Sequence, residues 1–223
     1  MSVVRPEFGP TLPELVAPRL RTLSRGMQVA LVAGVVLAVA AAVVVVSALR
    51  DSDGRTQVVV RGPTAFNLLQ PRSLERVSPR GGEVLRLQTR SGTAAPQRFT
   101  ARPLRLGPYR GDVSAALMML SPRMIDDMRA TVPGFVWRGD GKARVNEATG
   151  YQILYQAKIG GHTVYGRRVL VVPDVEDAPP PRAGMDLDLR SARSPAVPNI
   201  DSVGRNGALK LPLTSFRFGT ERP

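Results

Sequence analysis

Few residues of this chain have the types that acid–base, nucleophilic or metal chemistry requires. The 223 residues include no cysteine and a single histidine, His162. This excludes disulfides, thiolate metal sites, cysteine nucleophiles and any site built on two histidines. His162 follows two glycines, a position that predicts a solvent-facing hairpin turn. A Ser-His-Asp hydrolase is therefore not expected, because His162 would be its only candidate base.

The acidic residues form pairs, but none has the spacing of a known site. Asp126 and Asp127 are consecutive on a predicted helix, so their side chains diverge by about 100° and cannot share a proton. Asp186 and Asp188 lie on one face of a predicted strand. With residues 176–177 nearby they could bind Ca²⁺, but the spacing of a calcium loop is absent. We expect a solvated charged strand face instead.

Asp140 and Glu147 support an alternative function, that of an envelope hydrolase using carboxylates. The segment Gly139–Lys142 around Asp140 lacks the spacing and the trailing Ser or Thr of a phosphate-binding loop, and it predicts a turn. We predict no catalytic residue, no metal site, no cofactor and no enzymatic activity.

Arginine is the residue type that the chain holds in excess. Lys and Arg number 31 against 18 Asp and Glu, a formal net charge of +13, and residues 50–223 contribute +11 of it. The arginines are dense in the first third of this region. The candidate ligand-binding basic face consists of Arg86, Arg90, Arg98, Arg102 and Arg105. The alternative is that an arginine-rich genome produces a basic surface without a ligand.

Period-two patterns predict the strands that would hold these arginines. The predicted strands cover residues 83–90, 97–106, 151–159, 163–172, 185–189 and 215–218. Pro103 makes the second of them an edge candidate, and Gly160-Gly161 predicts a hairpin between the third and the fourth. Residues 135–145 predict two short strands that turn at residues 139–141.

Helical patterns are fewer. Residues 112–131 predict two short helices, because Ser121-Pro122 has the types of an N-cap and a first helical residue. Residues 201–211 predict one more helix, and the acidic, proline-rich residues 174–184 predict an exposed loop. Together the patterns predict an α+β fold, a mainly antiparallel-sheet domain with a few short helices.

An uncharged apolar stretch, residues 27–49, precedes this domain. As a helix it would be about 34 Å long, enough for a hydrocarbon core of about 30 Å. Three closely spaced arginines before it outweigh two after it, which predicts a cytoplasmic N-terminus. The predicted organisation is a disordered cytoplasmic stub, a single transmembrane helix and an extracytoplasmic domain, at residues 1–26, 27–49 and 50–223. A cleaved signal peptide ending near Val46-Ser47-Ala48 is the alternative.

The chain resembles two groups of proteins. In its high ratio of Arg to Lys and its predicted single-pass organisation, the chain resembles actinobacterial envelope proteins without an assigned activity. The element order, with Phe66–Pro71 at its start and Ser215–Phe218 at its end, resembles the PsbP/Mog1-type fold over residues 56–219. That resemblance implies a non-enzymatic accessory or binding module, and it supplies no catalytic residues.

The predicted function is that of a membrane-anchored, extracytoplasmic binding or accessory module of the cell envelope. Its basic surface would bind an anionic polymer, a lipid or an acidic partner protein. Nucleic acid is not an expected partner, because an outward-facing domain rarely meets it. Small residues at three- and four-residue spacing around Gly34 would also permit weak homo-oligomer formation through the anchor.

Overall fold

The computed structural model describes residues 26–27, 33–34, 36–37, 39, 55–90, 92, 96–174 and 182–221. The chain divides into two compact units, Met1–Asp53 and Gly54–Pro223. The described residues of the first unit are helical. Among all described residues, no helix is both long and apolar enough to cross a membrane. The predicted stub and the predicted span lie largely outside the described residues and stay predictions.

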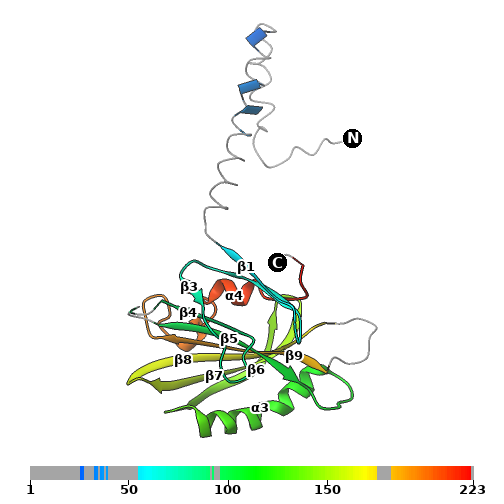
Figure 1. Ribbon diagram of the computed structural model, residues 1–223, viewed down its shortest axis with the longest axis vertical. Helices are drawn as coiled ribbons and strands as arrows, with labels where there is room; N and C mark the ends of the chain where they lie inside the picture. Colours follow the sequence, from blue (N-terminus) through cyan, green and yellow to red (C-terminus); the bar gives the residue numbers. More distant parts are fainter. Residues whose placement is uncertain are drawn as a thin grey trace, which may run out of the picture. The chain divides into compact units, whose positions relative to one another are not determined.

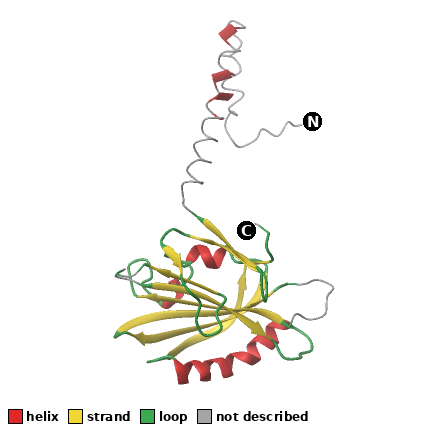
Figure 2. Cartoon of the chain, viewed as in Figure 1, coloured by secondary structure: helices red, strands yellow, loops and turns green. Residues whose placement is uncertain are grey.

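Two antiparallel sheets make up the second unit (Figures 1 and 2). The small sheet has the order β1-β2-β10, with β1 Thr56–Val60, β2 Phe66–Gln70 and β10 Arg217–Phe218. The large sheet has the order β3-β4-β5-β9-β8-β7-β6, with β3 Leu74–Arg76, β4 Leu85–Thr89, β5 Gln97–Arg105, β9 Ala183–Ala192, β8 His162–Val172, β7 Ala148–Ile159 and β6 Val136–Val145. The predicted antiparallel α+β domain is confirmed.

The main core lies between the two sheets. Along β5 and β9, alternate residues such as Phe99, Ala101 and Leu187 are fully buried on the face toward the small sheet. Phe66 of β2 stacks on Phe216 with ring centroids 5.3 Å apart, and the short helix α4, Lys210–Thr214, packs against β2. Because side chains alternate along a strand, the residues between these apolar ones point to the opposite face.

Helix α3, Val113–Thr131, covers the β7 side of that opposite face (Figure 1). Its buried Leu117 packs in a cluster with Tyr151 and Leu170, and Met128 packs with Tyr155. The Asp112 side chain caps the helix by accepting a hydrogen bond from the Ser114 N–H at 2.9 Å. Strands β4, β5 and β9 lie further across the sheet, where their polar side chains lie beyond the main packing of α3.

The prediction of two helices over residues 112–131 is wrong, because α3 continues through Pro122. Proline removes the N–H that would bond to the Met118 carbonyl. Pro122 is exposed and Met118 is 48% exposed, so the interruption lies on the solvent side of the helix. Ser121 is buried and donates to the Asp140 carboxylate at 3.1 Å instead of starting a second helix.

Two further predictions need correction. Residues 136–145 form the single strand β6, whose extra residue is absorbed by a bulge between Trp137 and Gly139 rather than by a turn. Residues 201–211 do not form one helix; the 3-10 helix η1, Ile200–Ser202, and α4 flank a turn there. Gly204 and Gly207 have φ of +75° and +69°, and this left-handed backbone interrupts a helix.

The hairpin prediction is confirmed and the edge-strand prediction is wrong. Gly160 and Gly161 join β7 to β8 with φ of +58° and +79°, as a type I′ turn requires. Strand β5 lies between β4 and β9. Pro103 is tolerated there because Ala101 is the last β5 residue that bonds toward β4, through its carbonyl and the Val84 N–H. Pro103 faces the same side beyond the end of β4, where no ladder bond is lost.

Candidate functional site

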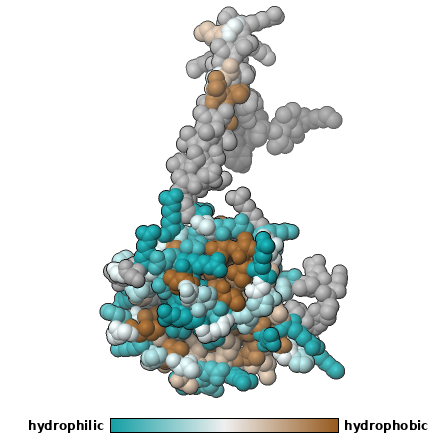
Figure 3. All heavy atoms as spheres, in the orientation of Figure 1, coloured by the Kyte–Doolittle hydropathy of each residue, from teal (hydrophilic) through white to brown (hydrophobic). Residues whose placement is uncertain are grey.

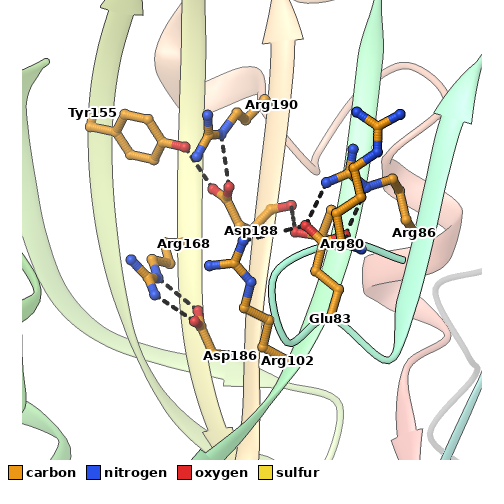
Figure 4. A network of polar contacts seen from close by, with 10 residues as sticks. Arg80, Glu83, Arg86, Arg102, Tyr155, Arg168, Asp186, Asp188 and Arg190 are labelled. Carbon is orange, nitrogen blue, oxygen red and sulfur yellow. Dashed lines mark hydrogen bonds and ion pairs between the residues drawn. The ribbon is translucent and has the colours of Figure 1, made fainter. Parts of the chain in front are cut away.

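The face of the large sheet opposite the main core carries a network of arginines and carboxylates from β4, β5, β8, β9 and the loop before β4 (Figure 4). We call it the arginine network. Its members are Arg86, Arg98, Arg102, Arg168 and Arg190, with Glu83, Asp186 and Asp188. The strand register brings them together, since Arg102 lies opposite Asp186 and Arg98 opposite Arg190.

One buried ion pair of the network joins Arg168 to Asp186. The guanidinium donates through both Nε and Nη2 to the two carboxylate oxygens, at 2.8 and 2.5 Å. The two side chains are 17% and 7% exposed. Burial alone would lower the pKa of Arg168, but its hydrogen bonds to Asp186 and the charge of that carboxylate raise the pKa overall.

Asp188 is held by a second arginine and by a buried tyrosine. Arg190 Nε donates to it at 2.7 Å, and the Tyr155 hydroxyl donates at 2.6 Å. The Arg190 guanidinium also lies 5.6 Å from the centroid of the Tyr155 ring. Burial, and then the charge of Asp188, raise the pKa of Tyr155 well above its ordinary value. Tyr155 therefore stays a hydrogen-bond donor at neutral pH.

Glu83 is shared by two arginines. Arg86 donates to it through Nε and Nη2 at 2.7 and 2.8 Å, and Arg102 Nη2 lies 3.3 Å away. The Glu83 side chain is only 2% exposed. Burial alone would raise the pKa of Glu83, but the hydrogen bonds from Arg86 and from the Arg80 amide lower it overall. All three carboxylates of the network are thus occupied by arginines.

Arg98 is the member of the network without such a carboxylate. Within the described part of the chain it forms no side-chain hydrogen bond or ion pair, and its Nε is buried without a partner. Burial, and then the neighbouring charge of Arg190, lower the pKa of Arg98. Arg98 and Arg190 line a hollow of about 390 Å³, together with apolar side chains including Ile159 and Val164.

The predicted basic face is only partly brought together. Arg86, Arg98 and Arg102 lie on one face, and Arg90 lines the hollow beside Arg98. Arg105 is exposed at the end of β5. Because side chains alternate, it lies on the same face as Phe99 and Ala101, which is the face toward the main core and not the face of the arginine network.

Sequence reasoning missed Arg168 and Arg190, and it treated Asp186 and Asp188 as solvated. That expectation is wrong, because both carboxylates are enclosed by arginines. The alternation Asp186-x-Asp188-x-Arg190 was the available signal, since it sets charges of opposite sign on one strand face.

The structure separates the two carboxylates named for a hydrolase. Asp140 lies within β6 and accepts hydrogen bonds from Tyr151 and Ser121, at 2.7 and 3.1 Å. The bond from Tyr151, with burial second, raises the pKa of that tyrosine to about 12. Glu147 lies in the turn after β6. Asp140 is five residues before the end of β6. At the usual rise of a strand this places its backbone about 16 Å from the end where the turn with Glu147 begins.

The other polar residues considered from the sequence lie on the surface. His162 is exposed at the start of β8, as expected, and Asp126 and Asp127 are exposed on α3. Among the described residues, no group of three His, Cys, Asp or Glu residues could hold a metal ion. Residues 176–177, considered for Ca²⁺, lie outside the described residues.

Comparisons with known proteins support the fold. The sequence matches no protein-family model and no curated protein. The solution structure of cyanobacterial PsbP (CyanoP) from Synechocystis sp. PCC 6803 has a TM-score of 0.51 and 8% identity, over 75% of this chain and 94% of that chain. The crystal structure of LpqN, involved in cell envelope biogenesis of Mycobacterium tuberculosis, has a TM-score of 0.47 and 12% identity, over 78% and 94%.

The Saccharomyces cerevisiae Ran-binding protein Mog1p has a TM-score of 0.46 and 7% identity, over 73% of this chain and 94% of that chain. At such identities the comparisons concern the fold alone. The predicted similarity to the PsbP-type fold is confirmed at that level by CyanoP. The resemblance to actinobacterial single-pass envelope proteins stays a prediction.

Proposed function

We propose that the unit Gly54–Pro223 is an accessory module of the cell envelope that binds an anionic polymer at the arginine network. The observation that carries this proposal is Arg98, a half-buried arginine at the edge of an open hollow, whose buried Nε has no hydrogen-bond partner and whose guanidinium forms no ion pair among the described residues. A buried charge without a partner is costly. An anionic group of a ligand in the hollow would supply the missing partner.

The balance of charge in the network supports an anion as ligand. Five arginines face three carboxylates, and each of the three already accepts hydrogen bonds from an arginine. This surplus of positive charge is concentrated in the network, whereas the general excess of arginine is spread over the chain. On the face of the molecule shown in Figure 3, hydrophilic residues lie among smaller apolar patches. A basic composition alone would not place an arginine with a buried, unpartnered Nε beside a hollow.

The side chains around the hollow favour a polymer whose charged groups are joined by short carbon segments. A guanidinium donates two parallel hydrogen bonds to phosphate or carboxylate groups. Ile159 and Val164 line the same hollow and can contact the carbon atoms between the charged groups. The envelope location rests on the predicted apolar anchor and its orientation.

Replacing Arg98 with methionine is expected to weaken binding of poly(glycerol phosphate) by about tenfold or more. The full chain, purified in a non-ionic detergent, would be titrated with this polymer by calorimetry. Arg105→Met is the matched control, because it removes the same charge from the same strand on the other face. Its affinity is expected to stay within about twofold of the parent. The free energy of unfolding should not fall in Arg98→Met, since the variant removes a half-buried charge that forms no ion pair among the described residues.

Equal losses in the two variants would contradict the proposal, because they would show that only the net charge matters. Polyglutamate, and phosphatidylglycerol mixed into the detergent micelles, would be titrated beside the phosphate polymer. Binding to the phosphatidylglycerol micelles alone, lost in Arg98→Met, would replace the polymer by a lipid surface as the partner. Failure of all three probes would refute an anion-binding role for this face.

A further inference from the structure

A second basic hollow lies on the other face of the large sheet from the arginine network, the face toward the main core. It is found where β8 meets the segment between η1 and α4. Its volume is about 380 Å³. Among the described residues, its lining includes four cationic side chains and no carboxylate. These are Arg144, Arg167, Arg205 and Lys210. Because neighbouring residues of a strand point to opposite faces, Arg167 belongs to this hollow while Arg168 belongs to the arginine network.

Arg167 is held in this hollow without a counterion. Its Nε is buried and has no hydrogen-bond partner, while Nη1 donates to the Val203 carbonyl at 3.3 Å. Burial, and then the charge of Arg205, lower the pKa of Arg167. The charge of Asp201 acts in the other direction, but no ion pair joins Asp201 to Arg167 within the described residues. An entering anion would satisfy this guanidinium.

The turn at Gly204 places the second cation beside the first. Gly204 has a φ of +75°, and a Cβ there would lie 2.6 Å from Leu213 and 2.9 Å from Leu189. Only glycine therefore fits this position, and the next residue, Arg205, is exposed at the hollow. Lys210 is also exposed, at the start of α4. In the described part of the chain neither side chain forms an ion pair.

Arg144 closes the hollow from β6. Its Nε donates to the Asn146 carbonyl at 3.0 Å, and its Nη2 lies 3.8 Å from the Asp174 carboxylate. Both Arg144 and Asp174 are more than half exposed, so this pair is weak. The four cations thus come from three separate segments, β6, β8 and the region from η1 to α4, and they surround one space.

We infer that this hollow binds a single phosphate group, separately from the arginine network. Three guanidinium groups and an ammonium group match the several oxygens of a phosphate, which accepts hydrogen bonds from different directions. The four cations surround one space, so one phosphate with a short attached group fits it better than a length of polymer. A soluble phosphate compound and the headgroup of a phospholipid share this chemistry.

The test is a calorimetric titration of the full chain, in a non-ionic detergent, with inorganic phosphate and with glycerol 1-phosphate. We expect saturable binding that Arg167→Gln weakens by about tenfold. Arg76→Gln removes the same charge from an exposed position on β3 and should leave the affinity unchanged. Arg98→Met should also retain binding, so that a failure of this inference is distinct from a failure of the polymer site.

Arg205→Gln protects the test against misfolding of the Arg167 variant, because Arg205 is exposed. It should weaken phosphate binding by about threefold or more without changing the unfolding midpoint. Tighter binding of a short-chain phosphatidylglycerol than of glycerol 1-phosphate would identify a lipid headgroup as the source, and equal binding a soluble phosphate. The inference is overturned if no saturable binding occurs, or if Arg76→Gln loses as much affinity as the two hollow variants.

Discussion

Replacing Asp186 with alanine is expected to lower the free energy of unfolding by about 3–5 kcal/mol. The change leaves the Arg168 guanidinium, only 17% exposed, without the carboxylate that accepts two of its hydrogen bonds. A buried charge that loses its partner retains the cost of leaving water but not the attraction that offset it. Urea unfolding at neutral pH would measure the loss.

The control for Asp186→Ala is Asp126→Ala, which removes a carboxylate from an exposed pair. Asp126 and Arg129 are 70% and 63% exposed, so the expected change is below about 1 kcal/mol. A double variant, Asp186→Leu with Arg168→Met, should recover most of the stability, because it removes both charges and keeps the volume filled. Similar losses in Asp186→Ala and Asp126→Ala would show that the network pair is not buried as described.

Gly166→Ala is expected to destabilise the fold by about 2–3 kcal/mol. Gly166 lies opposite Tyr155 in the β7–β8 pairing, and a Cβ there would come within 2.1 Å of the tyrosine ring. The ring cannot move aside, since it stacks on Phe135 and its hydroxyl is bonded to Asp188. The same urea titration measures this change.

Gly141→Ala is the matched control for Gly166→Ala. Gly141 lies on the edge strand β6, where an added Cβ meets no atom within 4 Å. Its stability should stay within about 0.5 kcal/mol of the parent, because this edge-strand position has open space for a methyl group. An unchanged stability of Gly166→Ala would contradict the close packing of Tyr155 over this strand.

The sequence predicts which residues share a face of a strand, but not which strands become neighbours. Period two correctly sets Arg98 and Arg102 opposite the apolar Phe99 and Ala101. It does not reveal that Arg102 lies beside Asp186, because that pairing joins strands far apart in the chain. The strand register decides which arginines pair with a carboxylate. It gives four of them such a partner and leaves Arg98 without one among the described residues.

The two proline signals show a different limit. Proline lacks a backbone N–H. From this property the sequence predicts an edge strand at Pro103 and the start of a helix at Pro122. The structural cost depends on whether that N–H would have had a partner. Pro103 faces past the end of β4, and Pro122 is exposed on α3. Such surroundings belong to the folded chain, so the local sequence could not decide either case.

The measurement that tests the central claim most directly is the salt dependence of polymer binding. The full parent chain would be titrated with poly(glycerol phosphate) at about 50 mM and about 500 mM salt. If the arginine network binds anions, binding should be saturable at the lower concentration and at least about tenfold weaker at the higher one. No binding at low salt, or an affinity that does not change with salt, would contradict the account.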